Sequence, residues 1–298
     1  MVGEPSVVDC TLSDGTETRC FAVTVTGEPV DHPSGPWCPT NIEQTGAEAG
    51  GIWLENDEVH EVDGPFVASL ADFYDDDAWQ LFDPDSGEIR LTDTLEGCRA
   101  AARPKVDPEY NNYCVQCEVS YVSQGSTKTY VVPVEPVALG EPVPVTDDFG
   151  AGLAFNGVRI DGPAPRDAIL AAHTLAPFDD CGGHVNLAVG YHYHAVTGCS
   201  TEIATEVADH APAIGIALDG HLLHARLDGD GAEPADLDAC RGHVVEGLGY
   251  HYHANDPAAN AILPCHVAAV GCALAGAETS CDATAPVATT GPGAREHD

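Results

Sequence analysis

The chain has little positive charge. Its 298 residues include 11 Lys and Arg against 48 Asp and Glu, which gives a formal net charge of −37. Proteins that bind DNA, RNA or anionic lipid need basic side chains to neutralise phosphate. The composition therefore argues against a nucleic-acid partner and against membrane association. The acidic residues are spread along the chain, which favours a solvated acidic surface over a dedicated site for divalent cations or a mineral.

Long apolar segments and familiar catalytic motifs are also missing. No stretch approaches the ~20 apolar residues that a transmembrane helix requires, so we expect no membrane insertion. The first residues, Met-Val-Gly-Glu-Pro, do not resemble a signal peptide, and we expect an exported form to be a mature chain with an added Met. Neither Gly-x-Ser-x-Gly nor His-Glu-x-x-His occurs, so an enzymatic activity would have to depend on a bound metal.

Cysteine, in contrast, is abundant. Twelve Cys are present, and a protein that keeps so many usually oxidises them outside the cytosol. We therefore expect six disulfides and a secreted or extracytoplasmic location, at the cell surface or in the periplasm. Cys114 and Cys117 form a Cys-x-x-Cys pair on a strand-like pattern, not at a helix start, which favours structural disulfides with other partners over a redox pair.

The composition also predicts the fold class. The 31 Gly and 22 Pro favour many turns and short strands over long helices. We expect a mainly β, β-rich α+β fold, with antiparallel sheets, an internally duplicated core and few short helices. The expected parts are a β-rich portion packed on the core (1–145), the duplicated core (146–275) and a low-complexity C-terminal tail (276–298).

Local patterns predict several elements. Residues 21–26 form the clearest early strand, residues 31–35 a turn, and residues 135–148 a Pro- and acid-rich connector without periodicity. A β-hairpin is predicted from 113–121 and 129–134 around Gln124-Gly125. Helices are predicted at 165–172 and 200–209, and disorder from about residue 282.

The strongest feature is a repeat. Residues 179–195 and 238–254 align without a gap and are identical at 11 of 17 positions, including Asp-x-Cys-x-Gly-His and Tyr-His-Tyr-His. A fainter match relates 152–157 to 215–220. We call residues 152–195 the first copy and residues 215–254 the second copy. Two copies of one unit often pair about a pseudo-twofold axis, which would bring the two histidine groups near one another.

The repeated histidines have a spacing suited to metal binding. Alternate side chains of a strand share one face, so His192 and His194 point the same way. His184 follows a glycine that permits a tight turn and could complete the set. The second copy repeats this arrangement with His243, His251 and His253. Three imidazoles suit copper or zinc; the alternative is a purely structural histidine network. Expected acceptors for the other ring nitrogens are Asp179, Asp219 and Asp238.

The remaining histidines and the repeated cysteines give weaker predictions. Four residues are possible further ligands: His32, Asp219, His221 and His224. His221 and His224 lie near Asp219-Gly220 and could line the same cavity, whereas His32 could approach only through the fold. Five histidines lack a supporting pattern and are expected to be surface or core residues: His60, His173, His210, His266 and His297. Each copy has a second Cys soon after Tyr-His-Tyr-His. The symmetry between the copies therefore suggests the disulfides Cys181–Cys199 and Cys240–Cys265.

These motifs resemble the YHYH domain family. The matching pieces are Asp31-His-Pro-Ser-Gly35, Gly152-Leu-Ala-Phe-Asn-Gly-Val158, Gly190-Tyr-His-Tyr-His194, Ile214-Gly-Ile-Ala-Leu-Asp-Gly220, Leu237-Asp-Ala-Cys-Arg-Gly-His243 and Tyr250-His-Tyr-His253. The resemblance implies an extracytoplasmic protein with a metal site, and no particular reaction. It strengthens His32 as a candidate site residue, because Asp31-His-Pro-Ser-Gly35 is one of the matching pieces. His221-Leu-Leu-His224 departs from the family pattern, an aromatic-Pro-Ile-Tyr segment, and adds an imidazole pair.

Three classes of function are consistent with this sequence. The first is an extracellular copper- or zinc-binding protein built on the two repeats. The second is a metalloenzyme, with a zinc-bound water on three histidines for hydrolysis or hydration, or a copper centre for oxygen chemistry; its small-molecule substrate is left open. The third is an acidic surface or matrix protein with a structural ion. A closed coordination shell favours the first, and an open position facing a pocket favours the second.

Overall fold

The computed structural model describes residues 1–35, 37–101, 106–122, 126–145 and 150–285. Two compact units alternate along the chain. Unit 1 combines Met1–His32, Gln124–Pro163 and His192–Ala288, and unit 2 includes Pro33–Ser123 and Ala164–Tyr191. The boundary thus falls inside the first copy, between Tyr191 and His192. Strands dominate unit 1, and over the whole described chain the helices are few and short, which confirms the predicted mainly β fold.

The larger sheet of unit 1 contains both Tyr-His-Tyr-His strands. Its order is β13-β14-β12-β11-β7-β8-β10. These strands are β7 (Gly152–Ala154), β8 (Arg159–Ile160), β10 (Gly190–Tyr193, which begins in unit 2), β11 (Ala213–Ala217), β12 (Leu222–His224), β13 (Gly242–Val245) and β14 (Gly249–His253). β7 and β11 pair antiparallel in the middle, while β8–β10 and β12–β14 pair parallel on either side. The six strands from β14 to β10 are arranged symmetrically about β7 and β11, which confirms the duplicated core.

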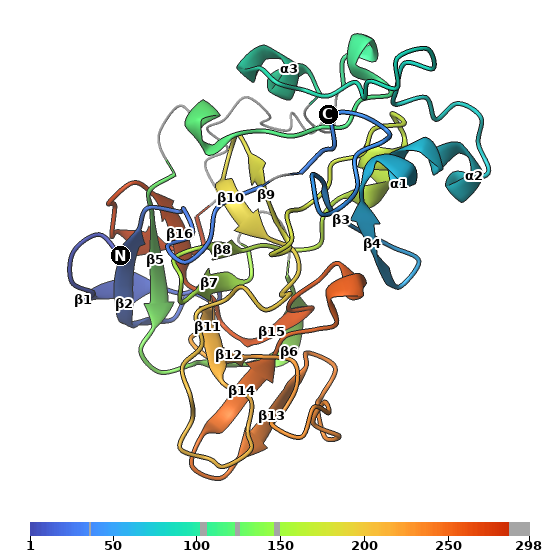
Figure 1. The fold of residues 1–298 in the computed structure, drawn as a ribbon. Coiled ribbons are helices and arrows are strands. Elements are labelled where there is room, and N and C mark those ends of the chain that lie inside the picture. Colours follow the sequence, from blue (N-terminus) through green and yellow to red (C-terminus); the bar gives the residue numbers. More distant parts are fainter. Residues whose placement is uncertain (36, 102–105, 123–125, 146–149, 286–298) are drawn as a thin grey trace. The chain divides into compact units, whose positions relative to one another are not determined.

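This symmetry separates the histidine groups. The copies meet through β7 and β11, the strands that lead to Asn156-Gly157 and Asp219-Gly220. Four strands, β12, β11, β7 and β8, therefore stand between β14 and β10. The expectation that duplication brings the two histidine groups near one another was wrong, because the histidine strands lie away from the strands about which the copies pair (Figure 1).

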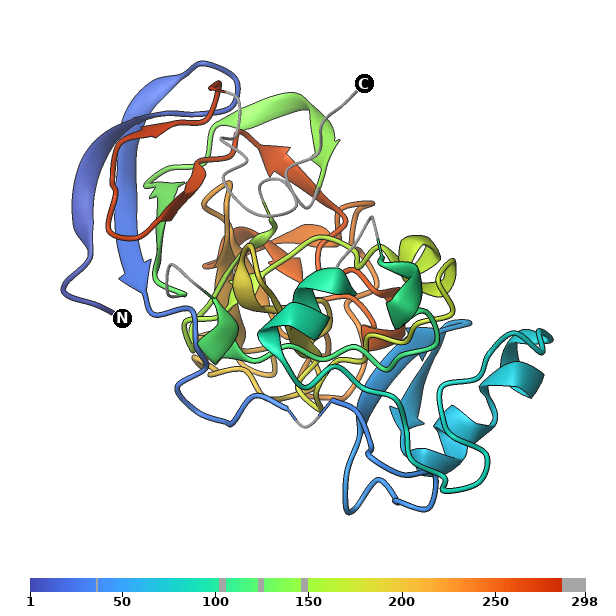
Figure 2. The same cartoon turned by 90° about the horizontal axis from the view of Figure 1, so that it is seen from above.

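A second sheet of unit 1 has the order β16-β5-β2-β1-β17. It consists of β1 (Ser6–Thr11), β2 (Glu17–Val25), β5 (Lys128–Pro133), β16 (Cys272–Ala275) and β17 (Cys281–Asp282), and Figure 2 shows these segments side by side. Leu12 and Val131 are fully buried in its core. A separate pair joins β6 (Ala138–Pro144) to β15 (Cys265–Ala268). The prediction that residues 135–148 form a connector without regular structure was therefore wrong at β6. The backbone of β6 pairs with β15, which lies far along the chain.

Unit 2 has less regular structure. It contains the hairpin β3 (Gly51–Glu55) and β4 (Glu58–Val62), β9 (Gly183–Asn186), α1 (Gly64–Ala68), α2 (Leu70–Tyr74), α3 (Leu95–Ala100) and α4 (Arg166–Leu170), with 3-10 turns at Pro108–Tyr110 and Val119–Tyr121. Trp53 is fully buried and stacks on Phe178. The side chains of Asp63 and Thr94 cap α1 and α3 by accepting backbone N–H bonds.

Two secondary-structure predictions need correction, and three helices were not predicted. The helix predicted at 165–172 is confirmed by α4, but residues 200–209 contain no helix, because Ile203 pairs with Ala213 instead. Helices α1, α2 and α3 were not predicted. The hairpin from 113–121 and 129–134 was wrong: β5 pairs with β2 and β16. Gln124-Gly125 and the tail from residue 286 lie outside the described residues.

The cysteines are oxidised as expected. Cys38–Cys114 and Cys98–Cys117 confirm structural disulfides for the Cys-x-x-Cys pair, and Cys240–Cys265 confirms the pairing suggested by the repeat. Cys181 and Cys199 are also disulfide-bonded. The remaining bonds are Cys10–Cys20 and Cys272–Cys281. Among the described residues, no helix is long and apolar enough to cross a membrane.

Candidate metal centre

Five histidines of unit 1 gather beside the second Tyr-His-Tyr-His strand. Their sources are β12, β13, β14 and the segment before β11. We call them the second-copy cluster: His210, His224, His243, His251 and His253. His224 and His253 are 0% exposed and His251 is 1% exposed, whereas His210 is half-buried. Rings from separate elements are therefore held together away from bulk solvent.

Strand pairing explains how the rings meet. β13 and β14 are antiparallel with His243 opposite His251, and β12 runs parallel to β14 with His224 opposite His253. His251 and His253 share one face of β14, as predicted, with ring centroids 5.3 Å apart. Both neighbouring strands thus present an imidazole to the same face of the sheet.

Each ring nitrogen Nδ1 faces an oxygen that can only accept. In His210, His251 and His253 the partners are the carbonyl oxygens of Ala211, Gly249 and Ala225, at 2.9, 3.0 and 2.8 Å. In His243 the partner is the carboxylate of Asp236, at 2.8 Å. A hydrogen bond to such an acceptor places the proton on Nδ1 and leaves the lone pair on Nε2. We assign this tautomer to the rings of four histidines: His210, His243, His251 and His253.

The four Nε2 atoms point toward one another. His243 and His251 are 3.0 Å apart, His210 and His251 also 3.0 Å, and His243 and His253 3.1 Å, all measured between Nε2 atoms. The four ligand atoms lie within 4.8 Å of one another. With the protons on Nδ1, these contacts bring lone pairs together and are repulsive. A shared cation would turn that repulsion into attraction.

Burial keeps the rings of His224, His251 and His253 neutral. It is the largest cause lowering the pKa of His251 to about 3 and that of His253 to about 4. The pKa of His224 is also lowered, chiefly by burial. Neutral imidazole is the form that coordinates a metal, so these three rings can bind an ion at neutral pH without first losing protons.

The donor set fits a first-row transition ion. Tetrahedral coordination with metal–nitrogen bonds of 2.0–2.1 Å places ligand nitrogens about 3.3 Å apart, close to the spacings within the cluster. His224 adds a fifth ring, whose centroid is 4.4 Å from that of His251. Its Nδ1 donates to the Ala211 carbonyl, while its buried Nε2 has no hydrogen-bond partner among the described residues. Such an orphaned acceptor is costly unless something binds it.

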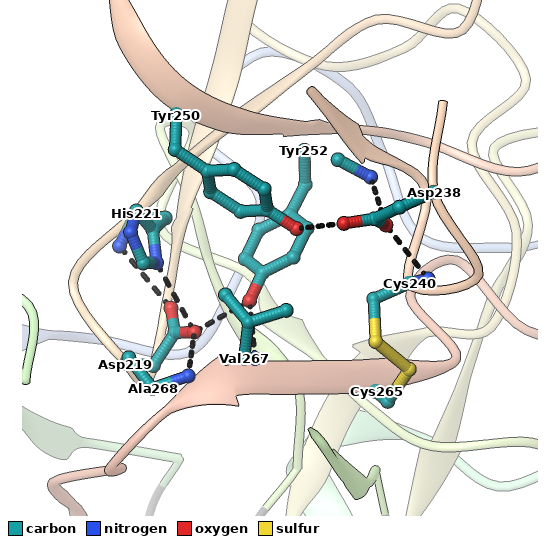
Figure 3. The surroundings of a disulfide bond; sticks show 10 residues. Asp219, His221, Asp238, Cys240, Tyr250, Tyr252, Cys265, Val267 and Ala268 are labelled. Atoms are coloured by element: carbon teal, nitrogen blue, oxygen red, sulfur yellow. Dashed lines mark hydrogen bonds and ion pairs between the residues drawn. A yellow bond between two sulfur atoms is a disulfide. The ribbon is translucent and has the colours of Figure 1, made fainter. Parts of the chain in front are cut away.

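The tyrosines of the motif occupy the opposite face of β14. The Tyr252 hydroxyl donates to Asp219 at 2.5 Å, and the Tyr250 hydroxyl donates to Asp238 at 2.8 Å (Figure 3). In unit 2 the Tyr191 hydroxyl likewise donates to Asp179. The expectation that these aspartates orient ligand histidines was therefore wrong. They accept from the tyrosines, because alternation along the strand turns histidines and tyrosines to opposite faces.

Asp-x-Cys-x-Gly-His forms a turn that fixes His243. Asp238 accepts bonds from the backbone N–H groups of Cys240 and Gly242, and Cys240 is bonded to Cys265. Gly242 is not one of the described glycines with a positive φ. The sequence argument that the glycine before the histidine is needed for a tight turn therefore does not apply to it. Instead, a Cβ at Gly242 would lie 2.0 Å from the Tyr250 hydroxyl oxygen. The glycine makes room for the tyrosine ring.

We expect Gly242→Ala to disturb this turn strongly. The added methyl must displace Tyr250 from Asp238 or shift the backbone that carries His243, so we predict a loss of about 1–3 kcal/mol in the free energy of unfolding. Urea unfolding of the metal-free protein measures it. Gly140→Ala is the matched control, because a Cβ at exposed Gly140 meets nothing within 4 Å. Equal effects of both substitutions would contradict this assignment.

The first-copy histidines are distributed over both units. His192 and His194 belong to unit 1, are buried, and have ring centroids 4.8 Å apart. The Nδ1 of His194 donates to the Gly162 carbonyl at 2.6 Å, and burial lowers the pKa of this ring to about 3. His184 lies on β9 of unit 2, half-buried against Phe178.

The weaker candidates have separate surroundings. His32 contacts Asp31 through Nδ1 and the Tyr193 hydroxyl through Nε2. His221 lies beside Asp219 on the tyrosine face (Figure 3), with its ring 4.8 Å from that of Tyr250. Of the four secondary candidates, His224 alone joins the second-copy cluster.

Sequence reasoning missed His210. We expected a surface or core residue, yet its Nε2 lies 3.0 Å from that of His251. It stands outside both aligned segments, in a stretch without regular structure, so spacing offered no signal. His173 and His266 match the expectation, since they bind the Asp76 carboxylate and the Ala151 carbonyl. His60 packs on Phe66 and Phe73, and His297 lies outside the described residues.

Comparison with known proteins supports the resemblance found in the sequence. Residues 129–234 match the model of a family described as YHYH protein. The match includes the first copy with His192 and His194, and it ends before His243, His251 and His253. No curated protein and no solved structure matches the chain.

Proposed function

We propose that this is an extracytoplasmic protein that binds copper or zinc, and that the second-copy cluster is its principal metal site. The observation that carries the proposal is the convergence of four Nε2 lone pairs, from His210, His243, His251 and His253, on one point. A structural histidine network would need protons between these nitrogens, whereas their Nδ1 partners hold the protons elsewhere. The disulfide-bonded cysteines support an oxidising compartment.

The number of protein donors favours binding over catalysis. Catalytic zinc sites usually have three protein ligands and an open position for water, whereas four ligands close a tetrahedral shell. Four imidazoles of the second-copy cluster converge, and the fifth, His224, lies beside them. A carrier, buffer or sensor of the ion therefore fits the geometry better than a hydrolase or an oxygen-activating enzyme. All donors are imidazoles, which suit both copper and zinc.

We extend the metal-binding proposal to the first copy. The duplicated sequence indicates that His184, His192 and His194 correspond to His243, His251 and His253. His192 and His194 are buried and neighbouring, as are their counterparts. This predicts a second ion, separate from the first.

Elemental analysis of protein purified without a polyhistidine tag tests the principal site. After reconstitution and removal of loose metal, wild type should retain at least one equivalent of copper or zinc. His210→Ala removes the ligand that lies outside the repeat and should weaken retention at least about tenfold. His173→Asn is the control, because it removes an imidazole that binds the Asp76 carboxylate and packs against Trp79. Sub-stoichiometric metal in wild type would contradict the proposal.

A further inference from the structure

The two copies can be matched residue by residue through their contacts. The His194 ring donates to the Gly162 carbonyl, and the His253 ring donates to the Ala225 carbonyl. In the strand register, Tyr193 lies opposite Ile160, and Tyr252 lies opposite Leu223. The residue after Ile160 therefore corresponds to the residue after Leu223.

This register identifies a chemical difference between the two centres. The residue after Leu223 is His224, the fifth imidazole of the second-copy cluster. The residue after Ile160 is Asp161, a carboxylate that is 5% exposed. The preceding residues differ as well, since Arg159 occupies the place of Leu222. The duplication has thus kept the histidine strand and changed the strand beside it.

Asp161 is directed at the first-copy histidines. Its Oδ1 accepts from the Arg159 guanidinium at 2.9 Å and from the Gly162 N–H at 3.1 Å. Its Oδ2 lies 4.0 Å from Nε2 of His192. Two ligand atoms at this distance can both bind one ion with bonds of 2.0–2.2 Å when they lie on opposite sides of the ion. A small rotation of the carboxylate would bring the two atoms closer and allow them to bind on adjacent sides.

We propose that the two copies hold different classes of ion, because Asp161 supplies an oxygen donor to the first centre. This rests on the proposed function, that the histidine groups bind metals. All-imidazole donors suit copper and zinc, whereas imidazoles combined with a carboxylate suit Fe²⁺ and Mn²⁺. Arg159 holds the other carboxylate oxygen and so fixes the direction of Oδ2. The first centre selects a harder ion than the second.

Mn²⁺ titration followed by the EPR signal of the free ion tests this inference. The protein is first loaded with one equivalent of Zn²⁺ to fill the second-copy cluster. Wild type should then bind about one equivalent of Mn²⁺, and Asp161→Asn should weaken its affinity at least about tenfold. Unchanged affinity in Asp161→Asn, or no Mn²⁺ binding by wild type, would overturn the assignment.

A swap variant keeps the test decisive if loss of the buried charge disturbs folding. Arg159→Leu/Asp161→His gives the first copy the residues of the second, Leu222 and His224. We expect this variant to lose Mn²⁺ binding and to gain a second tightly held equivalent of Zn²⁺. Retained Mn²⁺ binding would mean that Asp161 is only the ion-pair partner of Arg159. Failure of the second-copy cluster to take Zn²⁺ in any variant would instead contradict the proposed function.

Discussion

Removing His251 and His253 together should abolish metal binding at the second-copy cluster. In His251→Ala/His253→Ala, two of the four converging Nε2 atoms are gone, and the remaining pair cannot hold the ion against water. Because an ion that binds the folded state alone stabilises it, wild type should gain roughly 4 kcal/mol in free energy of unfolding at a free metal concentration 1,000 times Kd. The variant should lose the gain that the second-copy cluster contributes, which urea unfolding with and without metal measures.

The comparison in EDTA separates a ligand role from a structural one. Without metal, the two alanines leave a cavity, which lowers the free energy of unfolding. They also remove the repulsion between Nε2 lone pairs at 3.0–3.1 Å, which raises it, so the two effects oppose each other. We therefore expect the two proteins to differ much less in EDTA than with metal. His173→Asn should keep the full metal-dependent gain. A variant that is equally destabilised in EDTA and in metal would contradict the ligand assignment.

Loss of the Cys240–Cys265 disulfide should also have a large effect, on both the free energy of unfolding and the affinity for metal. The sequence separation is 25 residues, for which the chain-entropy model gives about 3.5 kcal/mol of stabilisation. The disulfide also holds the turn of Asp238 and Gly242 that carries His243. Cys240→Ala/Cys265→Ala should therefore lower both the free energy of unfolding and the affinity for metal, measured by urea unfolding and by competition with a chromophoric chelator.

Cys10→Ala/Cys20→Ala provides the control. This disulfide has a separation of 10 residues and lies in the other sheet of unit 1, so its loss should cost about 3 kcal/mol and leave the metal affinity unchanged. If both double variants lose metal affinity equally, the turn has no special part in placing His243, and general destabilisation explains the effect.

The duplicated turn is the part of the site that sequence predicted best. Its alignment across the copies indicated the Cys240–Cys265 pairing, and strand alternation indicated that His251 and His253 share a face. The roles of Asp238 and Gly242 in the same turn were misassigned. Both are explained by Tyr250, whose hydroxyl binds the carboxylate and whose ring lies against the glycine. The alternation rule gives the direction of each side chain but not its partner.

What the sequence determined by itself is therefore local: the β-rich class, the internal duplication and the pairs of histidines two residues apart. These follow from the two-residue period of a strand and from identity between segments, neither of which depends on distant contacts. The tertiary structure decided which residues complete the site. His224 joins through the parallel pairing of β12 with β14, and His210 through the course of an irregular segment. It also separated the two histidine groups, since β7 and β11 pair at the centre, and sequence periodicity does not encode which strands become neighbours.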